Sequence, residues 1–170
     1  RVQLQKMEGI ADLRRAFVSK LAEENADLET VRVCWYPENS EPAWWFLLIR
    51  IYPEKLTVDK AQFAAAVAAE GIPMGAGYGA VATRAHWLQN QCAFGKESHF
   101  PWDTLWEGGV EAAGSGRLRT QGDWDEALKV PGAEAADANH MRMTVHECVG
   151  EQEALDTAAA LRKVEAEYKK

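Results

Sequence analysis

The chain has 170 residues and a formal net charge of −7, with 47% hydrophobic and 26% charged residues. These values are typical of a globular domain with a real core, and the acidic balance argues against a nucleic-acid surface, which needs a basic stripe. No apolar run approaches the roughly 20 residues that cross a bilayer, so we expect no membrane contact. The cysteines Cys34, Cys92 and Cys148 form no close pair, which favours a reduced, cytoplasmic setting.

Residues 1–30 predict a long amphipathic helix. Its apolar residues recur every three or four positions and form one stripe: Leu4, Met7, Ile10, Leu13, Phe17 and Leu21. No capping residue precedes Val2, so the helical pattern is already running at Arg1. We therefore expect this helix to link the rest of the chain to a large N-terminal domain that these 170 residues lack. Removal of a tag is the alternative explanation of such a start.

Residues 31–170 predict a small α+β domain that begins with two strands. The stretch 31–36 alternates and contains β-branched and aromatic residues, and 43–52 is a longer apolar run. Between them, the Pro, Asn and Ser content of 37–42 is typical of a turn. The sequence therefore predicts an antiparallel hairpin.

A capped helix and a glycine-rich turn follow the second strand. Asp59 and Gln62 have the spacing of a capping box, in which each side chain bonds a backbone amide of the other residue. Gly71 suits the left-handed position that ends a helix, and Pro73 prevents its restart. A turn is then expected over Gly75–Gly79.

The middle of the chain carries weaker signals. The glycine-rich stretch 107–125 predicts an exposed, mobile excursion, and we interpret 107–129 as an insertion. A short turn of helix is expected at 124–129. After a break at Pro131, another short helix is expected at 133–138.

The end of the chain returns to clear patterns. Residues 141–146 alternate apolar with polar, as in a strand covered on one face, and 151–168 form an amphipathic helix. Strands and helices are segregated along the chain. The predicted fold is therefore α+β, with a small, mostly antiparallel sheet of about three strands covered by helices on one face.

Five segments share their order and spacing with one known family: RVQLQKMEGIADLRR, WWFLLIRIYPEKL, DKAQFAAAVAAEGIPMGAGY, CAFG, and MRMTVHE followed by LDTAAALRKVEAEY. Together they resemble the C-terminal domain of the DegT/StrS-type aminotransferases, which are pyridoxal-phosphate enzymes of fold type I. The resemblance covers most of the chain outside 107–129. It implies a domain that closes over a keto sugar on a nucleotide, or over a cyclitol, together with an amino donor, and a homodimer for the full-length enzyme.

The resemblance also implies where the functional residues lie. In that family the Schiff-base lysine and the residues that hold the cofactor belong to the large domain, so we expect no catalytic and no cofactor-binding residue in this chain. Tyr78 matches the family's substrate-contacting tyrosine after the glycine turn. Arg84 is a phosphate partner by its charge, and His86 is the nearest match to a His or Tyr that the family places a few residues later. Each of the three is alternatively a solvated or packing loop residue.

Motifs of other function classes are incomplete. The glycine turn lacks the spacing and the Lys-Ser/Thr pair of a phosphate loop. His86, Cys92 and His99 match no zinc pattern, so no metal site is expected. A Cys92–His86 nucleophile pair has only closeness in sequence in its favour. The alternative function is a free-standing, non-catalytic α+β module for ligand binding or protein interaction.

Overall fold

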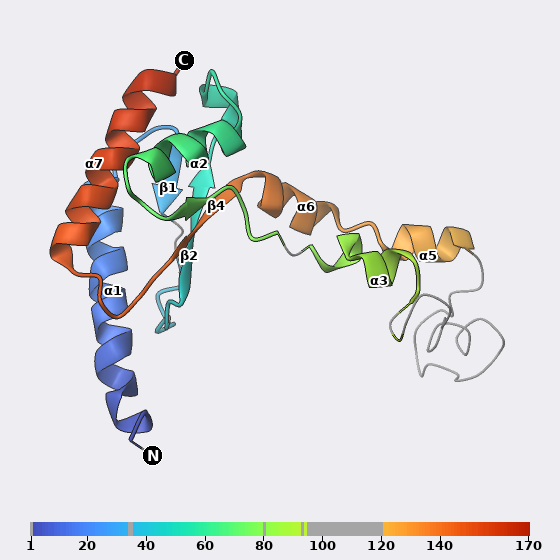
Figure 1. Ribbon diagram of the computed structural model, residues 1–170, viewed down its shortest axis with the longest axis horizontal. Coiled ribbons are helices and arrows are strands. Elements are labelled where there is room, and N and C mark those ends of the chain that lie inside the picture. Colours follow the sequence, from blue (N-terminus) through green and yellow to red (C-terminus); the bar gives the residue numbers. More distant parts are fainter. Residues whose placement is uncertain (1, 34–35, 80, 93, 95–120) are drawn as a thin grey trace. The chain divides into compact units, whose positions relative to one another are not determined.

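The computed structural model describes residues 2–33, 36–79, 81–92, 94 and 121–170 (Figure 1). The chain divides into two compact units. The first combines Arg1–Tyr78 with Asp137–Lys170, and the second is Gly79–Ala136.

The first unit is built on a four-stranded antiparallel sheet with the strand order β1-β2-β4-β3. The strands are β1 (Val31–Val33), β2 (Phe46–Ile51), β3 (Met74–Gly75) and β4 (His140–Thr144). The central strands β2 and β4 come from distant parts of the sequence, and their register places Ile49 opposite Met141. The predicted strands 31–36, 43–52 and 141–146 are all present. The strands β2 and β4 are shorter than predicted, and residues 34–35 of the first lie outside the described residues.

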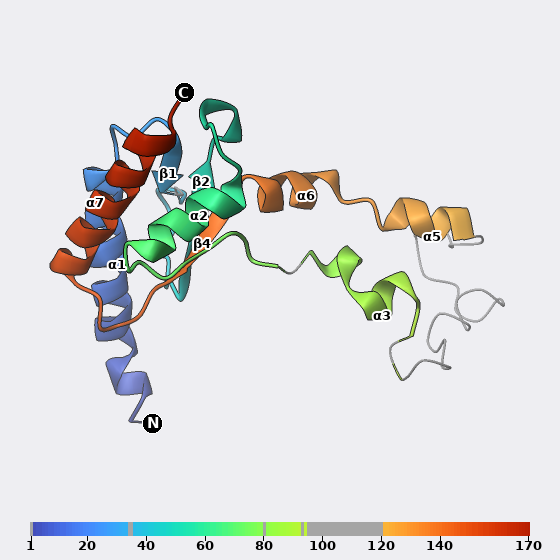
Figure 2. The ribbon, with the colours of Figure 1, turned by 45° about the horizontal axis from the view of Figure 1, so that its top comes forward.

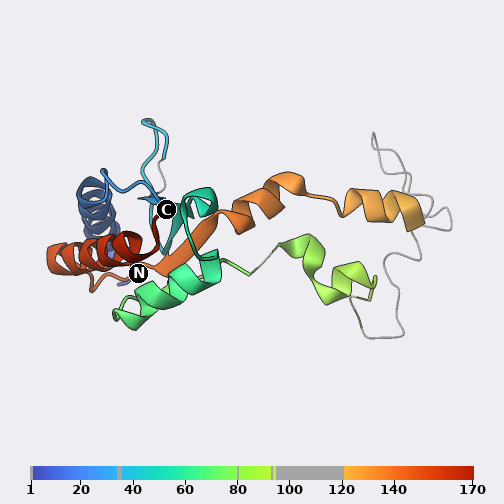
Figure 3. The same cartoon turned by 90° about the horizontal axis from the view of Figure 1, so that it is seen from above.

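Three helices pack on one face of this sheet (Figure 1, Figure 2, Figure 3). They are α1 (Met7–Glu24), which follows a 3-10 turn at Leu4–Lys6, α2 (Lys60–Ala69) and α7 (Glu151–Tyr168). The core between sheet and helices includes fully buried side chains from every layer, among them Leu21, Leu47, Ile49, Phe63, Met141 and Leu161. This arrangement confirms the predicted α+β fold and its long N-terminal helix.

The caps of α2 are those that the sequence predicts. The Asp59 carboxylate accepts the backbone N–H of Gln62 at 2.8 Å, and the Gln62 side-chain oxygen accepts the N–H of Asp59 at 3.3 Å. Gly71 has φ +92°, in the left-handed region that glycine adopts without strain. Local sequence signals therefore fix both ends of this helix.

The predicted apolar stripe of α1 is only half covered. Phe17 and Leu21 are buried, whereas Leu4, Met7 and Leu13 are 50–69% exposed. The helical period is correct, but the first half of the helix has no described element packed over its stripe. An exposed apolar face of this kind marks a contact surface.

The second unit holds a 3-10 turn at Ala82–Arg84 and the helices α3 (His86–Gln89), α5 (Gln121–Ala127) and most of α6 (Pro131–Ala138). Pro131 begins α6 instead of breaking a helix, because proline suits the first helical turn, where its missing N–H has no partner to lose. Of the predicted insertion, 107–120 lies outside the described residues. Within the described ranges, no helix combines the length and apolarity that a membrane span requires.

Candidate functional site

The strand residues that point away from the helices give the sheet an unusual second face. Burial alternates along β2 and β4, so that Leu47, Ile49 and Met141 are buried while their neighbours are exposed or half-buried. We call this second face the arginine face. Its side chains are Arg32 from β1, Phe46, Leu48 and Arg50 from β2, and His140, Arg142 and Thr144 from β4.

Basic side chains form a row across three strands of the arginine face. Arg32 lies directly opposite Arg50, and Arg50 lies opposite His140 on its other side. Directly opposed residues have Cβ atoms only about 5 Å apart, and like charges at that distance repel. Within the described ranges, no carboxylate forms an ion pair with Arg32, Arg50 or Arg142. Arginines without a local carboxylate, such as these three, are an arrangement that an anionic ligand stabilises.

Aromatic rings border the same face. Tyr78 stacks on Phe46, with ring centroids 5.1 Å apart and an interplanar angle of 25°. The Arg142 guanidinium lies 5.9 Å from the centroid of Tyr78, and the Arg50 guanidinium lies 5.1 Å from that of Tyr52. Tyr78 is still 46% exposed, so part of this side chain is accessible to a ligand. The face therefore offers both anion-binding donors and flat apolar surfaces.

The glycine turn places Tyr78 on this face. Gly75 is the last residue of β3 and pairs with Arg142, so the chain leaves the sheet beside that arginine. A Cβ atom at Gly77 would lie 3.1 Å from the Asp137 side chain and 3.4 Å from the Lys60 amine, so only a small residue fits there easily. Lys60 in turn donates to the backbone carbonyls of Asp137 and His140 and ties the start of β4 to α2.

Of the three residues predicted as substrate-binding, Tyr78 belongs to the first unit, and Arg84 and His86 belong to the second. Arg84 ends the 3-10 turn and His86 begins α3, and both are exposed. The structure brings His86 together with Cys92, with 3.8 Å between Nδ1 and Sγ. No cluster of metal-ligating side chains occurs in the described part of the chain.

The sequence did not predict the row of Arg32, Arg50 and His140, or the position of Phe46 beside Tyr78. The alternation of residues 141–146 already indicated that Arg142 lies on the uncovered face of its strand, whereas the apolar run 43–52 gave no such signal. Their pairing depends on a register between strands almost 100 residues apart, and no local pattern encodes that register.

The described lysines differ in what their amines contact. The Lys60 amine donates to two backbone carbonyl oxygens. Lys6 and Lys55 are exposed, and the remaining described lysines form ion pairs or donate to backbone carbonyls.

The comparisons with known proteins add no assignment. No protein-family model matches the chain, and no curated protein matches it.

Proposed function

We propose that this chain is the substrate-capping C-terminal domain of a pyridoxal-phosphate-dependent aminotransferase that acts on a nucleotide-linked keto sugar or a cyclitol. The observation that carries the proposal is the arginine face with Tyr78 on it. The chain supplies substrate contacts, and a preceding large domain supplies the lysine and the rest of the cofactor site. The chain by itself does not transaminate.

The chemistry of the arginine face suits a phosphorylated sugar. Arginine binds phosphate through paired N–H donors, and several arginines on one face neutralise a diphosphate. An exposed aromatic ring such as Tyr78 packs against the apolar side of a sugar or base. Arg142 lies beside that ring, so one ligand can contact both side chains. This combination favours a nucleotide-linked substrate over an uncharged cyclitol.

The uncovered stripe of α1 supports the need for a further domain. Val2, Leu4, Met7 and Leu13 are each at least half exposed. Beside them lies a shallow groove of about 680 Å³ lined mainly by residues of the same helix. Apolar surface of this kind is normally covered by another domain or subunit. We assign it to the large domain, in a cytoplasmic enzyme that is a homodimer when full-length.

The gene tests the domain assignment directly. We expect the coding sequence upstream of Arg1 to add about 200–250 residues, the size of a large domain, with a lysine that follows a strand. A start codon close to Arg1 would contradict the proposal and would favour a free-standing, non-catalytic binding module.

A chemical test on the 170-residue chain separates the same alternatives. Pyridoxal phosphate followed by borohydride traps a lysine that forms a Schiff base. We expect only slow, scattered labelling of surface lysines. Stoichiometric labelling of one lysine would show that the chain has its own cofactor site and would overturn the proposed division of labour.

A further inference from the structure

Two arginines of the arginine face contact aromatic rings where carboxylates would be expected. The Arg50 guanidinium lies 5.1 Å from the centroid of the Tyr52 ring, and the Arg142 guanidinium lies 5.9 Å from that of Tyr78. Within the described part of the chain, neither arginine forms an ion pair. A cation–π contact at an exposed site is weaker than a charge-assisted hydrogen bond. A phosphate group can therefore draw either guanidinium away from its ring.

Arg50 and Arg142 are close enough to bind one diphosphate together. Both lie on the arginine face, and the register pairs Arg50 with His140, two residues before Arg142 on β4. The two arginines are thus diagonal neighbours on adjacent strands, about 7–8 Å apart. Each guanidinium can donate two parallel N–H groups to one phosphate. The adjacent phosphates of a diphosphate can then take one arginine each.

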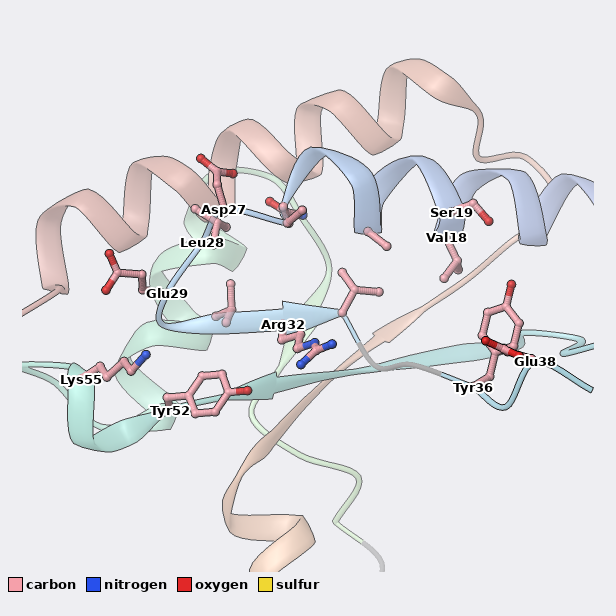
Figure 4. Close-up of a pocket in the computed structure, with 15 residues that line it drawn as sticks. Val18, Ser19, Asp27, Leu28, Glu29, Arg32, Tyr36, Glu38, Tyr52 and Lys55 are labelled. Carbon is pink, nitrogen blue, oxygen red and sulfur yellow. The ribbon is translucent and has the colours of Figure 1, made fainter. Parts of the chain in front are cut away.

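The edge of the sheet beside β1 suits phosphate less well. Arg32 lines a groove of about 1110 Å³ there, and the carboxylates of Glu29 and Glu38 line the same groove. Figure 4 shows Glu29 near one end of β1 and Glu38 near the other. Glu29 is neutralised by an ion pair, but Glu38 forms none among the residues that the structure describes. A carboxylate without a partner repels phosphate, so we place the diphosphate at Arg50 and Arg142.

An aromatic cluster lies beside Arg142 and consists of Trp45, Phe46 and Tyr78. Trp45 is 62% exposed, and its ring centroid lies 5.1 Å from that of Phe46. Tyr78, which stacks on Phe46, is also accessible. Accessible aromatic rings of this kind stack with a nucleobase of any type. Tyr52, by contrast, already has two cations beside its ring, so we place the base on the aromatic cluster.

The order of these groups along the sheet matches the order of groups in a nucleoside diphosphate. Phe46 and Arg50 are four residues apart on β2, which corresponds to about 13 Å. Arg142 lies between them, because it pairs with Leu48. The aromatic cluster, Arg142 and Arg50 therefore follow one another as the base, the inner phosphate and the outer phosphate do in the ligand.

We propose that the arginine face binds the nucleoside diphosphate part of the substrate in one direction. The base stacks on the aromatic cluster, Arg142 binds the inner phosphate, and Arg50 binds the outer phosphate. The two guanidiniums exchange their ring contacts for phosphate oxygens when the ligand binds. The identity of the ligand rests on the proposed function, and the inference adds where its base and its two phosphates lie. A nucleoside diphosphate without the sugar therefore binds the same residues.

Titration of the ¹⁵N-labelled 170-residue chain with UDP, uridine and inorganic diphosphate tests this placement. We expect UDP to shift the amide resonances of residues 46–50, Tyr78 and Arg142. Uridine and diphosphate should each bind at least about tenfold more weakly, since each lacks one half of the contacts. Equal binding of diphosphate and UDP, shifts confined to other parts of the chain, or no binding at millimolar UDP would overturn the proposal.

Two variants separate the phosphate contact from the base contact. Arg50→Met should weaken binding of UDP and of diphosphate about tenfold and leave uridine unchanged. Tyr78→Leu should weaken binding of UDP and of uridine at least about fivefold and leave diphosphate unchanged. Arg15→Met is the control and should change none of the three, and circular dichroism checks that each variant is folded. Variants that weaken all three ligands alike would overturn the placement.

Two further measurements separate this inference from its alternatives. A chain of four uridine nucleotides that binds more than about tenfold more tightly than UDP would overturn the proposal in favour of a surface for single-stranded nucleic acid. In the full-length protein, amino transfer to a nucleotide-linked keto sugar with unchanged kinetics for Arg50→Met and Tyr78→Leu would overturn the placement and leave the proposed function standing. UDP binding that both variants weaken, in a full-length protein without amino transfer, would support the placement and contradict the function.

Discussion

Replacing Glu165 by glutamine tests how the sheet edge is attached to the helical layer. Glu165 is 7% exposed on α7, and its carboxylate accepts three hydrogen bonds. One oxygen takes both the N–H and the hydroxyl of Thr30, which is fully buried, and the other takes the N–H of Glu29. All three groups are donors, so the site requires an acceptor at both oxygens.

The Glu165→Gln variant keeps the shape of the side chain but turns one acceptor into a donor. If the amide oxygen stays with Thr30, the NH₂ group meets the N–H of Glu29 and that bond is lost. The two remaining bonds lose the contribution of the charge, which roughly doubles the strength of a hydrogen bond. With about 1 kcal/mol for each such loss, we expect the free energy of unfolding to fall by about 2–3 kcal/mol.

Urea denaturation followed by circular dichroism measures this change. Glu167→Gln is the matched control, because Glu167 is exposed on the same helix, and we expect it to change stability by less than about 0.5 kcal/mol. If Glu165→Gln is as mild as the control, the three hydrogen bonds do not hold β1 on the helical layer.

Three further changes test the fold. The pKa of Asp27 is lowered by its hydrogen bond from Arg162, and that of Glu29 by its hydrogen bond from Lys169. The two carboxylates therefore add to the free energy of unfolding at pH values above their ordinary pKa values of 3.8 and 4.5. This stabilisation is lost as the pH falls through the lower pKa values of the folded state. The midpoint of urea unfolding, measured as the pH is lowered, should show this loss of stability, and the loss should be smaller at high salt. A loss that does not depend on salt would contradict the prediction. Asp59→Ala removes the N-cap of α2 and should lower the free energy of unfolding by about 1 kcal/mol, as measured by urea denaturation. An unchanged free energy of unfolding would show that the cap does not stabilise the helix. Phe63→Ala empties a fully buried site and should cost about 3–5 kcal/mol, and a cost under 1 kcal/mol would show a looser core.

The parts of the fold that the sequence predicted well are those with local causes. Asp59, Gln62 and Gly71 are read from spacing and backbone preference alone, and the structure confirms each. The last helix has the predicted limits, with Ala158, Leu161 and Val164 buried. These features depend on residues a few positions apart, so no knowledge of the tertiary fold was needed.

The parts that the sequence did not predict depend on pairing between distant residues. The strand β3 has only two residues, too few for any periodic pattern, and exists because Met74 and Gly75 pair with β4. The row of Arg32, Arg50 and His140 requires the registers of three strands. The sequence correctly predicted the apolar stripe of α1. It could not predict that, among the described residues, no element packs over the first half of this stripe.

Amino transfer by the full-length protein is the measurement that tests the central claim most directly. With pyridoxal phosphate, an amino donor and a nucleotide-linked keto sugar, we expect turnover that Arg142→Met impairs mainly by raising KM, with kcat/KM about 10–100-fold lower for one lost arginine–phosphate contact. Arg15→Met, which removes an arginine of α1 that pairs with Asp12, should leave the kinetics unchanged. Absence of amino transfer, or equal kinetics for Arg142→Met and the unmodified protein, would contradict the assignment of the arginine face to substrate binding.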